Sequence, residues 1–206
     1  MIDVLYHDDQ IVVANKPHDL LSVPGRSPDN QDCLWHRLQQ QFPTVRIVHR
    51  LDCATSGIMV LGLDADSHRE LSRQFHDRET SKRYIAVVAG TPEQSEGSVD
   101  LPVRCDWDNR PRQMVDHQQG KNALTHYRVL EQHADRARVE LTPITGRSHQ
   151  LRVHMQALGH PILGDRFYAD PAALAKSGRL LLHAQQLGFS HPGSGELVSF
   201  ETDCPF

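Results

Sequence analysis

Residues 47–63 read IVHRLDCATSGIMVLGL and place one acid, Asp52, between a basic segment and a long apolar run. The apolar part, residues 57–63, is bounded by turn residues and predicts a buried strand. Thr55 and its neighbours favour a turn, so we expect Asp52 in the loop that enters this strand. An acid there either bonds turn amides or Arg50, or it is used for chemistry, because rigidly held loops often carry function.

The rest of the chain is ordinary for a globular protein. Its 206 residues are 38% hydrophobic and 23% charged, which fits one domain over residues 1–206 with a sizeable core. No apolar run approaches the ~18 residues of a membrane span, and the first ten residues do not resemble a signal or transit peptide. The four cysteines are far apart and form no CxxC pair, so we expect reduced thiols in a cytoplasmic protein.

The net charge of −4 argues mildly against a nucleic-acid partner, but basic clusters interrupt the acidic average. They cover residues 68–83, 104–112 and 146–154, and the second also holds Trp107. Each cluster is either a solvated charged face or a local contact surface for an anionic polymer.

Seven apolar or β-branched segments predict strands. They lie at residues 3–17 (two strands around an Asp-Asp turn), 57–63, 82–90, 124–132, 137–144, 180–190 and 195–202. Strands outnumber helices and do not alternate regularly with them. The pattern therefore predicts an α+β protein built on a largely antiparallel, mixed β-sheet with flanking helices and loops.

Two helices are expected in the first half of the chain. The Ser67-x-x-Glu70 pattern predicts a capping box that opens a helix over residues 67–79. Asp32 is expected to cap a shorter helix that carries the apolar residues of 34–38.

A third helix is expected over residues 148–158, ending before Gly159. Its spacing places His149 and Arg152 on one face, with Arg147 beside the N-terminus. Two arginines at a helix start suit an anion, either a phosphate or a buried carboxylate. A surface helix with routine charges has the same pattern.

Two other kinds of site find little support in the sequence. His149 and His154 are five residues apart, and neither an HExxH nor a CxxC pattern is present, so we predict no metal site. The HRLD at 49–52 is similar to a kinase catalytic loop but lacks the Gly-rich and DFG motifs of that class. Tyr84, in the expected strand 82–90, is by itself typical of core packing with a hydroxyl at the edge.

Several segments together resemble the RluA family of pseudouridine synthases. Residues 49–63 resemble its HRLD-x-x-T-S-G motif, and NKPHDLLSVPG at 15–25 resembles its first motif. SKRYIAVVAG at 81–90 is similar to the tyrosine-bearing strand, and residues 146–168 to the arginine-bearing motif, followed by a late strand at 180–189. The resemblance covers nearly the whole chain and implies the pseudouridine synthase fold without an S4-type RNA-binding domain.

The segment LPVRCDWDNRPRQ at 101–113 and the short length are most similar to the dual-specificity branch of that family. This branch modifies a uridine in the transfer-RNA anticodon stem-loop and one in a hairpin of 23S ribosomal RNA. Cys53 is a small, neutral choice at a variable motif position. The alternatives are the same chemistry on a single different RNA, an RNA-binding module without catalysis, or a metal-dependent hydrolase.

The resemblance implies that Asp52 is the catalytic aspartate, that Tyr84 packs on the target base, and that Arg152 pairs with Asp52. Forming pseudouridine breaks the N1–C1′ bond, turns the base and joins C5 to C1′. A carboxylate does this by attacking C1′ or by removing the C2′ proton, and either role needs the ionised acid, which a nearby cation favours.

The remaining implied roles concern RNA. Arg50 and His49 are expected to fill the space of the flipped base or to hold a flanking phosphate. Backbone contact and base stacking are expected from Arg104, Trp107, Arg110, Arg112, Arg147 and His149. The isomerisation requires no cofactor, and we expect a monomer with no obligate protein partner and no membrane association.

Overall fold

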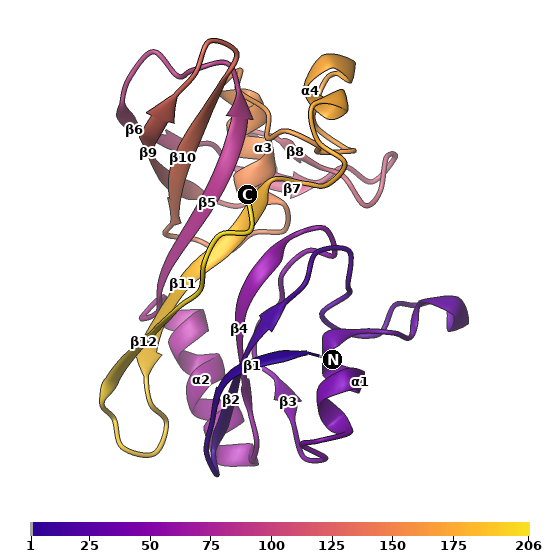
Figure 1. The fold of residues 1–206 in the computed structure, drawn as a ribbon, viewed down its shortest axis with the longest axis vertical. Helices are drawn as coiled ribbons and strands as arrows, with labels where there is room; N and C mark the ends of the chain where they lie inside the picture. The colour runs from indigo at the N-terminus through magenta and orange to yellow at the C-terminus, as the bar shows by residue number, and fades with distance from the viewer. Residues whose placement is uncertain (1) are drawn as a thin grey trace. The chain divides into compact units, whose positions relative to one another are not determined.

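The computed structural model describes residues 2–206, which form two compact units (Figure 1). The first unit runs to Lys82 and includes His183–Pro205; the second comprises Arg83–Leu182 with Phe206. The α+β class is confirmed, since short helices flank strands that are mostly antiparallel. A single domain over residues 1–206 stays a prediction. No helix in the described part of the chain is long and apolar enough to span a membrane.

The sheet of the first unit has the strand order β1-β2-β4-β11, with β3 paired to β4 and β12 to β11. The strand bounds are β1 Asp3–His7, β2 Ile11–Lys16, β3 Arg46–Ile47, β4 Ser56–Gly62, β11 Leu182–Ser190 and β12 Leu197–Glu201. β4 pairs parallel with β11, whereas the other pairs of this unit are antiparallel. Every residue of β4 is buried, as its unbroken apolar run predicts.

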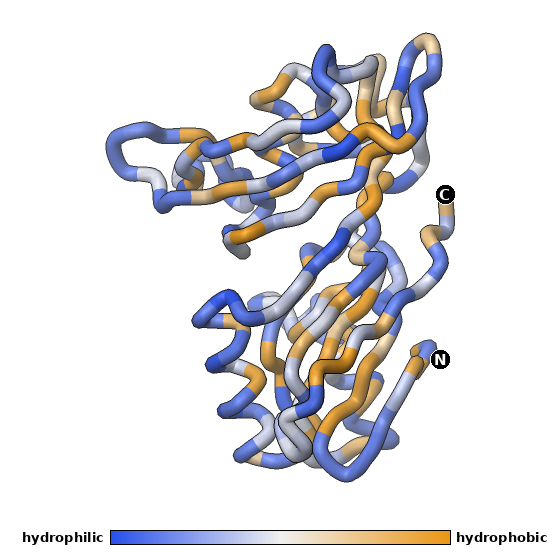
Figure 2. Tube along the Cα trace, turned by 90° about the vertical axis from the view of Figure 1, so that its left-hand side faces the viewer, coloured by the Kyte–Doolittle hydropathy of each residue, from blue (hydrophilic) through white to orange (hydrophobic). Residues whose placement is uncertain are grey.

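The core of the first unit lies between this sheet and the helix α2, Ala65–Asp77. Leu71 and Phe75 of α2 pack against Ile58 and Val60 of β4, as the helical spacing predicts. Figure 2 shows hydrophobic colour concentrated along the strands of this unit. The unit also contains α1, Leu34–Gln39, and a 3₁₀ turn, Pro28–Asn30.

Both predicted helix caps in this unit are wrong. Asp64, not Ser67, caps α2, and its Oδ1 accepts from the backbone nitrogen of Ser67 at 2.8 Å. The Sγ of Cys33 occupies the cap of α1, because Asp32 instead forms a two-bond ion pair with Arg37.

The sheet of the second unit has the order β5-β10-β9-β6, all antiparallel, beside a separate two-stranded hairpin β7-β8. The strand bounds are β5 Ser81–Ala89, β6 Glu96–Asp100, β7 Val103–Cys105, β8 Gln113–Val115, β9 Leu124–Gln132 and β10 Arg136–Pro143. Its helices are α3, Gln150–Ala157, and α4, Pro171–Ala175.

Helix α3 is fastened to one face of this sheet by two buried polar side chains. Gln150 donates to the carbonyl of Leu124 and to the hydroxyl of Thr125, both at 3.0 Å. His154 bonds Thr125 Oγ1 through Nδ1 and the carbonyl of Leu101 through Nε2, each at 2.9 Å. Burial lowers the pKa of His154, so the ring is neutral and acts as a structural link.

Candidate active site

The loop that carries Asp52 is held by hydrogen bonds on both sides of the acid. Ser22 Oγ donates to the carbonyl of Leu51 at 2.7 Å and accepts from its nitrogen at 3.1 Å. Lys16 Nζ donates to the carbonyl of Cys53 at 3.0 Å, and Thr55 N donates to the carbonyl of Asp52 at 3.1 Å. The backbone around the half-buried Asp52 is therefore fixed.

At the second position of β4, the strand that follows, only glycine fits. Gly57 has φ +124°, and a Cβ there would lie 2.3 Å from the carbonyl oxygen of Ala184 on β11. One residue earlier, Ser56 Oγ bonds Nδ1 of the buried His183 at 2.9 Å. This close approach of β4 and β11 gives the S-G of the motif a physical reason.

Arg50 and His49 precede the acid but differ in setting. Arg50 is exposed, as an RNA contact requires. His49 stacks on Phe75 with ring centroids 4.2 Å apart, and its Nε2 accepts from the nitrogen of Val60 at 3.2 Å. Burial, followed by the charge of Lys82, lowers the pKa of His49 to about 3. His49 is thus a neutral packing residue; contact with RNA through it stays a prediction.

Tyr84 and Arg152 belong to the second unit. Tyr84 pairs in register with Leu141 of β10, which in turn pairs with Tyr127 of β9, so these side chains share one face of the sheet. That face is the one to which His154 binds α3 through Thr125, which lies two residues from Tyr127. Tyr84 therefore projects on the side of the sheet that α3 covers, and α3 carries Arg152.

Arg152 is a buried cation held by a buried carboxylate. Its side chain is 3% exposed, and it donates from Nε to Oδ2 and from Nη2 to Oδ1 of Asp165, both at 2.7 Å. The anion expected at the start of α3 is therefore the carboxylate of Asp165, which belongs to the same unit. The pairing of Arg152 with Asp52 stays a prediction.

The start of α3 differs from the predicted helix by two residues. His149 is its N-cap and adopts the left-handed conformation, with φ 53°. Its ring stacks on Phe167 at 5.8 Å, and Arg152 Cζ lies 5.3 Å from the same ring, so the predicted shared face exists. Arg147 donates from Nε to the carbonyl of Asn122 at 3.1 Å.

The arginine and tryptophan tract forms the β7-β8 hairpin. At its tip, Trp107 is 64% exposed and Arg110 Cζ lies 4.9 Å from its ring centroid. Arg104 donates from Nε to Asp116 at 2.5 Å, and this ion pair, with backbone amides of the following turn, lowers the pKa of Asp116 to about 2. Arg112 Cζ lies 5.6 Å from the ring of Tyr168. The tract presents an exposed aromatic face and cations on a braced hairpin.

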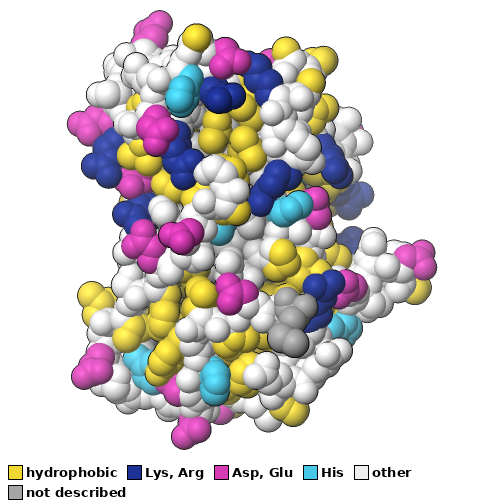
Figure 3. Space-filling view, viewed as in Figure 1, with side chains coloured by type: hydrophobic (Ala, Val, Ile, Leu, Met, Phe, Trp, Pro, Cys, Tyr) yellow, Lys and Arg dark blue, Asp and Glu magenta, His cyan; other side chains and the backbone are white. Residues whose placement is uncertain are grey.

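The two units differ in charge. The first has nine Lys and Arg against fifteen Asp and Glu, a formal net charge of −6, and the second has thirteen against eleven, a net of +2. On the face drawn in Figure 3, dark blue side chains gather over the second unit. The predicted RNA contacts other than Arg50 and His49 lie in the basic unit, which favours an anionic polymer.

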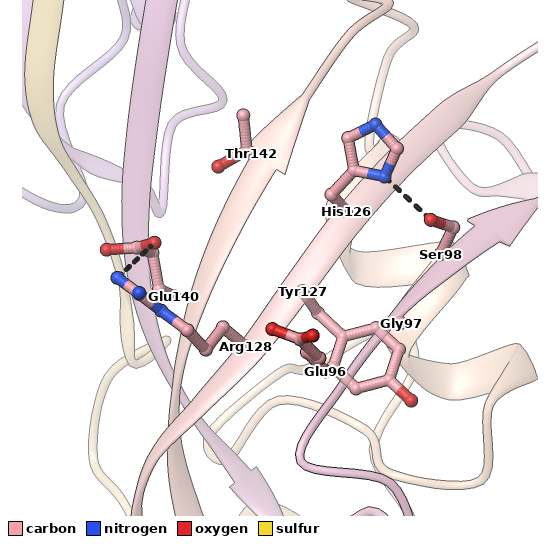
Figure 4. Close-up of a pocket in the computed structure, with 8 residues that line it drawn as sticks. All are labelled: Glu96, Gly97, Ser98, His126, Tyr127, Arg128, Glu140 and Thr142. Carbon is pink, nitrogen blue, oxygen red and sulfur yellow. Dashed lines mark hydrogen bonds and ion pairs between the residues drawn. The ribbon is translucent and has the colours of Figure 1, made fainter.

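A hollow of about 480 Å³ lies elsewhere on the second unit, over β6, β9 and β10 (Figure 4). Four of its polar side chains bond in pairs: Arg128 donates to Glu140 at 3.0 Å, and Ser98 bonds His126 at 2.6 Å. None of the predicted site residues lines it. Within residues 2–206 no three His, Cys, Asp or Glu side chains are grouped to hold a metal ion.

Three residues next to the predicted site were missed by sequence reasoning. Lys16 lies within the segment NKPHDLLSVPG, and Asp165 and Tyr168 lie within GDRFY. All three are buried, with Lys16 and Asp165 at 0% exposure. The available signal was the position of each residue within a segment that resembles a family motif, which does not indicate its contacts.

Known proteins of one family are similar to this chain over most of its length. The family model described as RNA pseudouridylate synthase matches residues 10–157. The chain is 55% identical over 204 residues to the "Dual-specificity RNA pseudouridine synthase RluA" of Escherichia coli strain K12, covering 98% of this chain and 93% of that protein. The protein of the same name from Pasteurella multocida is 51% identical, covering 100% and 94%.

Among solved structures, "Human RNA Pseudouridylate Synthase Domain Containing 1" aligns with a TM-score of 0.83 and 31% identity, over 100% of this chain and 84% of that one. "Human RNA Pseudouridylate Synthase Domain Containing 4" gives a TM-score of 0.77 and 30% identity, over 98% and 88%. The expected fold is confirmed. The chain belongs to the RNA pseudouridylate synthase family and is an isomerase that converts uridine to pseudouridine in RNA.

Proposed function

We propose that this isomerase has two classes of substrate, the anticodon stem-loop of transfer RNA and a hairpin of 23S ribosomal RNA. The observation that carries the proposal is the identity of about 55% to relatives named as dual-specificity enzymes, over 98% of the chain. The exposed Trp107 and its neighbouring arginines support it, since unpaired loop bases stack on aromatic side chains.

Asp52 is the residue that reacts at the sugar, by attack on C1′ or by removal of the C2′ proton. The bonds from Ser22 and Lys16 to its neighbours support this role, because a reacting group must be held in place before the substrate arrives. Arg152 compensates the charge of Asp52, and Tyr84 packs on the uracil once the glycosidic bond has broken.

The target nucleotide leaves its stack before Asp52 can reach it, at a cost of a few kcal/mol that is lowest in single-stranded loops. Arg50 fills the vacated space or holds a flanking phosphate. The β7-β8 hairpin, with Arg104, Trp107, Arg110 and Arg112, binds the RNA backbone and stacks on a base, and Arg147 and His149 extend this surface. The reaction requires no cofactor, because it is an isomerisation that neither loses a group nor changes oxidation state. We propose that the enzyme acts as a monomer in the cytoplasm.

The test uses transfer-RNA and ribosomal-RNA hairpins transcribed with uridine tritiated at C5. Pseudouridine formation releases this label to water, because C5 exchanges its hydrogen for the bond to the sugar. We expect the native protein to release label from both hairpins and Asp52→Asn to release none. Release from one hairpin alone would overturn dual specificity, and equal release by both proteins would remove Asp52 from its role. RNA binding without release from either hairpin would indicate another target or a binding module.

A further inference from the structure

The turn at residues 165–168 follows α3 in the chain and has no role in the proposed function. Asp165, at its start, is fully buried and accepts four hydrogen bonds. Two come from Arg152 at 2.7 Å, one from Phe167 N at 2.9 Å and one from Tyr168 N at 3.3 Å. One carboxylate therefore fixes both the turn and the arginine.

These bonds define how Arg152 presents its charge. Asp165 occupies the Nε and Nη2 edge of the guanidinium, so another carboxylate must approach through Nη1 or the second hydrogen of Nη2. The rings of Phe167 and Tyr168 lie 5.3 and 5.1 Å from Arg152 Cζ and limit its rotation. The guanidinium is held in one orientation by groups of its own unit.

Tyr168, at the end of the same turn, binds the hairpin. Its buried hydroxyl accepts from the backbone nitrogen of Gln113 at 2.7 Å and bonds His149 Nδ1 at the same distance. Gln113 is the first residue of β8, and Arg112 before it lies over the Tyr168 ring. The hydroxyl thus joins the hairpin to the first turn of α3.

We propose that the 165–168 turn is a positioning element with two separable parts. Asp165 orients Arg152 for the reaction, and the Tyr168 hydroxyl holds the β7-β8 hairpin in place for RNA. The proposal rests on the proposed roles of Arg152 and of the hairpin. Neither Asp165 nor Tyr168 touches the reacting atoms in this scheme, because each acts through another residue.

The two parts predict different kinetic effects, one on kcat and the other on KM. Asp165→Asn places an amide donor against the guanidinium and so displaces Arg152. A displacement of about 1 Å should lower kcat by about 100-fold, with KM for RNA within twofold. Tyr168→Phe removes one hydroxyl from the hairpin support and raises KM by about 3- to 10-fold, with kcat within twofold.

The matched controls are Asp135→Asn, which loses an ion pair to Lys176 in the same unit, and Tyr6→Phe, which loses a surface bond to Asp8. Both controls should match the native enzyme.

A second background separates positioning from general damage. In Arg152→Lys, adding Asp165→Asn should lower the residual kcat no further, because Asp165 acts only through the arginine. If the double variant instead shows the product of the two single losses in kcat, Asp165 does not act through Arg152 and its proposed role is overturned. A native kcat in Asp165→Asn alone would overturn it as well. A Tyr168→Phe variant with unchanged KM, or with kcat and KM altered alike, would overturn the role of the hydroxyl. If Asp165→Asn fails to fold, Asp165→Glu replaces it, since it keeps the charge but moves the carboxylate.

A readout independent of activity distinguishes this proposal from the proposed function. In ¹⁵N NMR spectra, the Arg152 Nε–H should exchange slowly in the native protein and rapidly in Asp165→Asn. Slow exchange in both, or rapid exchange in both, would overturn the positioning of Arg152 even in a fully active enzyme. Conversely, the expected NMR change in a protein that releases no label would refute the proposed function alone.

Discussion

Lys16 Nζ donates a hydrogen bond to the carbonyl oxygen of Cys53, the residue that follows Asp52, and two more to the carbonyls of Pro17 and Leu20. A fully buried ammonium group is costly unless acceptors surround it, and here three carbonyls do so. The hydrogen bonds of the Lys16 ammonium group thereby link the loop after β2 to the loop that carries Asp52.

Lys16→Met should therefore destabilise the protein and slow the reaction together. Methionine fits the volume but leaves three carbonyls without this donor, at a cost of about 3 kcal/mol in the free energy of unfolding. Urea unfolding and tritium release measure the two effects. Lys176→Met, which removes a lysine with a partly exposed ion pair, is the control and should change neither by much. Native stability in Lys16→Met would contradict the structural role of the ammonium group.

Gly57→Ala tests the close approach of β4 and β11. The added methyl group meets the backbone of Ala184 at 2.3 to 2.7 Å and also requires a φ of +124°. We expect a loss of about 3 kcal/mol or more in the free energy of unfolding, or failure to fold. Gly195→Ala separates the effect of backbone conformation from that of the close contact. Gly195 has φ +74°, but an added Cβ there would meet open space. This variant should lose only about 1 kcal/mol in the free energy of unfolding. Equal losses would show that the contact with Ala184 is unimportant.

The sequence predicted the long strands well because their signal is local. The apolar runs of β4 and β11 and the alternation in β10 depend only on which faces are buried. The strands β3, β6, β7 and β8 were missed, since each is short and is defined mainly by its partner strand. Cap residues were misassigned because several polar side chains near each helix start compete for the same amides.

The sequence says less about the site than about the strands. Asp52, Tyr84 and Arg152 are proposed as site residues because ordered motifs carry residue identity across the chain, and their roles stay a prediction. The contacts of Arg152 with Asp165 and of Tyr168 with Gln113 were not predicted, since they join positions 13 and 55 residues apart through side-chain geometry. The packing role of His49 likewise depends on Phe75 and Val60, which no local pattern connects to it.

The tip of the β7-β8 hairpin should contribute to RNA affinity in two measurable ways. Trp107→Ala removes a stacking surface and should weaken binding by about 1–3 kcal/mol. Arg110→Gln should reduce the salt slope of log K by about 0.7–0.9, the value for one released counterion. Fluorescence anisotropy over a range of salt concentrations measures both. Arg69→Gln, which alters an exposed arginine on α2, should leave the slope unchanged; a similar change there would make the effect one of net charge alone.

Tyr84→Phe tests whether the phenol removes the C5 proton in the last step. If it does, loss of this base should slow tritium release by about 100-fold or more, while RNA affinity stays close to native. The aromatic ring remains, so packing on the uracil is retained. Full release by Tyr84→Phe would leave the tyrosine with a stacking role only.

His49 should make the stability of the protein depend on pH. Its pKa is about 3 in the folded protein against an ordinary 6.5, because burial disfavours the charged ring. Below pH 6.5 the unfolded chain therefore binds a proton that the folded protein does not. The stability from the neutral ring is fully present above pH 6.5 and is lost as the pH falls toward 3, with a slope of at most about 1.4 kcal/mol per pH unit.

In His49→Phe, which keeps an aromatic ring against Phe75, this slope should be absent. The difference in unfolding free energy between the native protein and the variant should therefore shift in favour of the variant as the pH falls from about 6.5 to about 4.5. His117→Gln removes an exposed histidine and should leave the native slope in place. Parallel curves for the native protein and His49→Phe would mean that His49 is protonated in the fold. The Val60 nitrogen would then have no acceptor at Nε2, and His49 would be available as a cation beside Arg50 for a flanking phosphate.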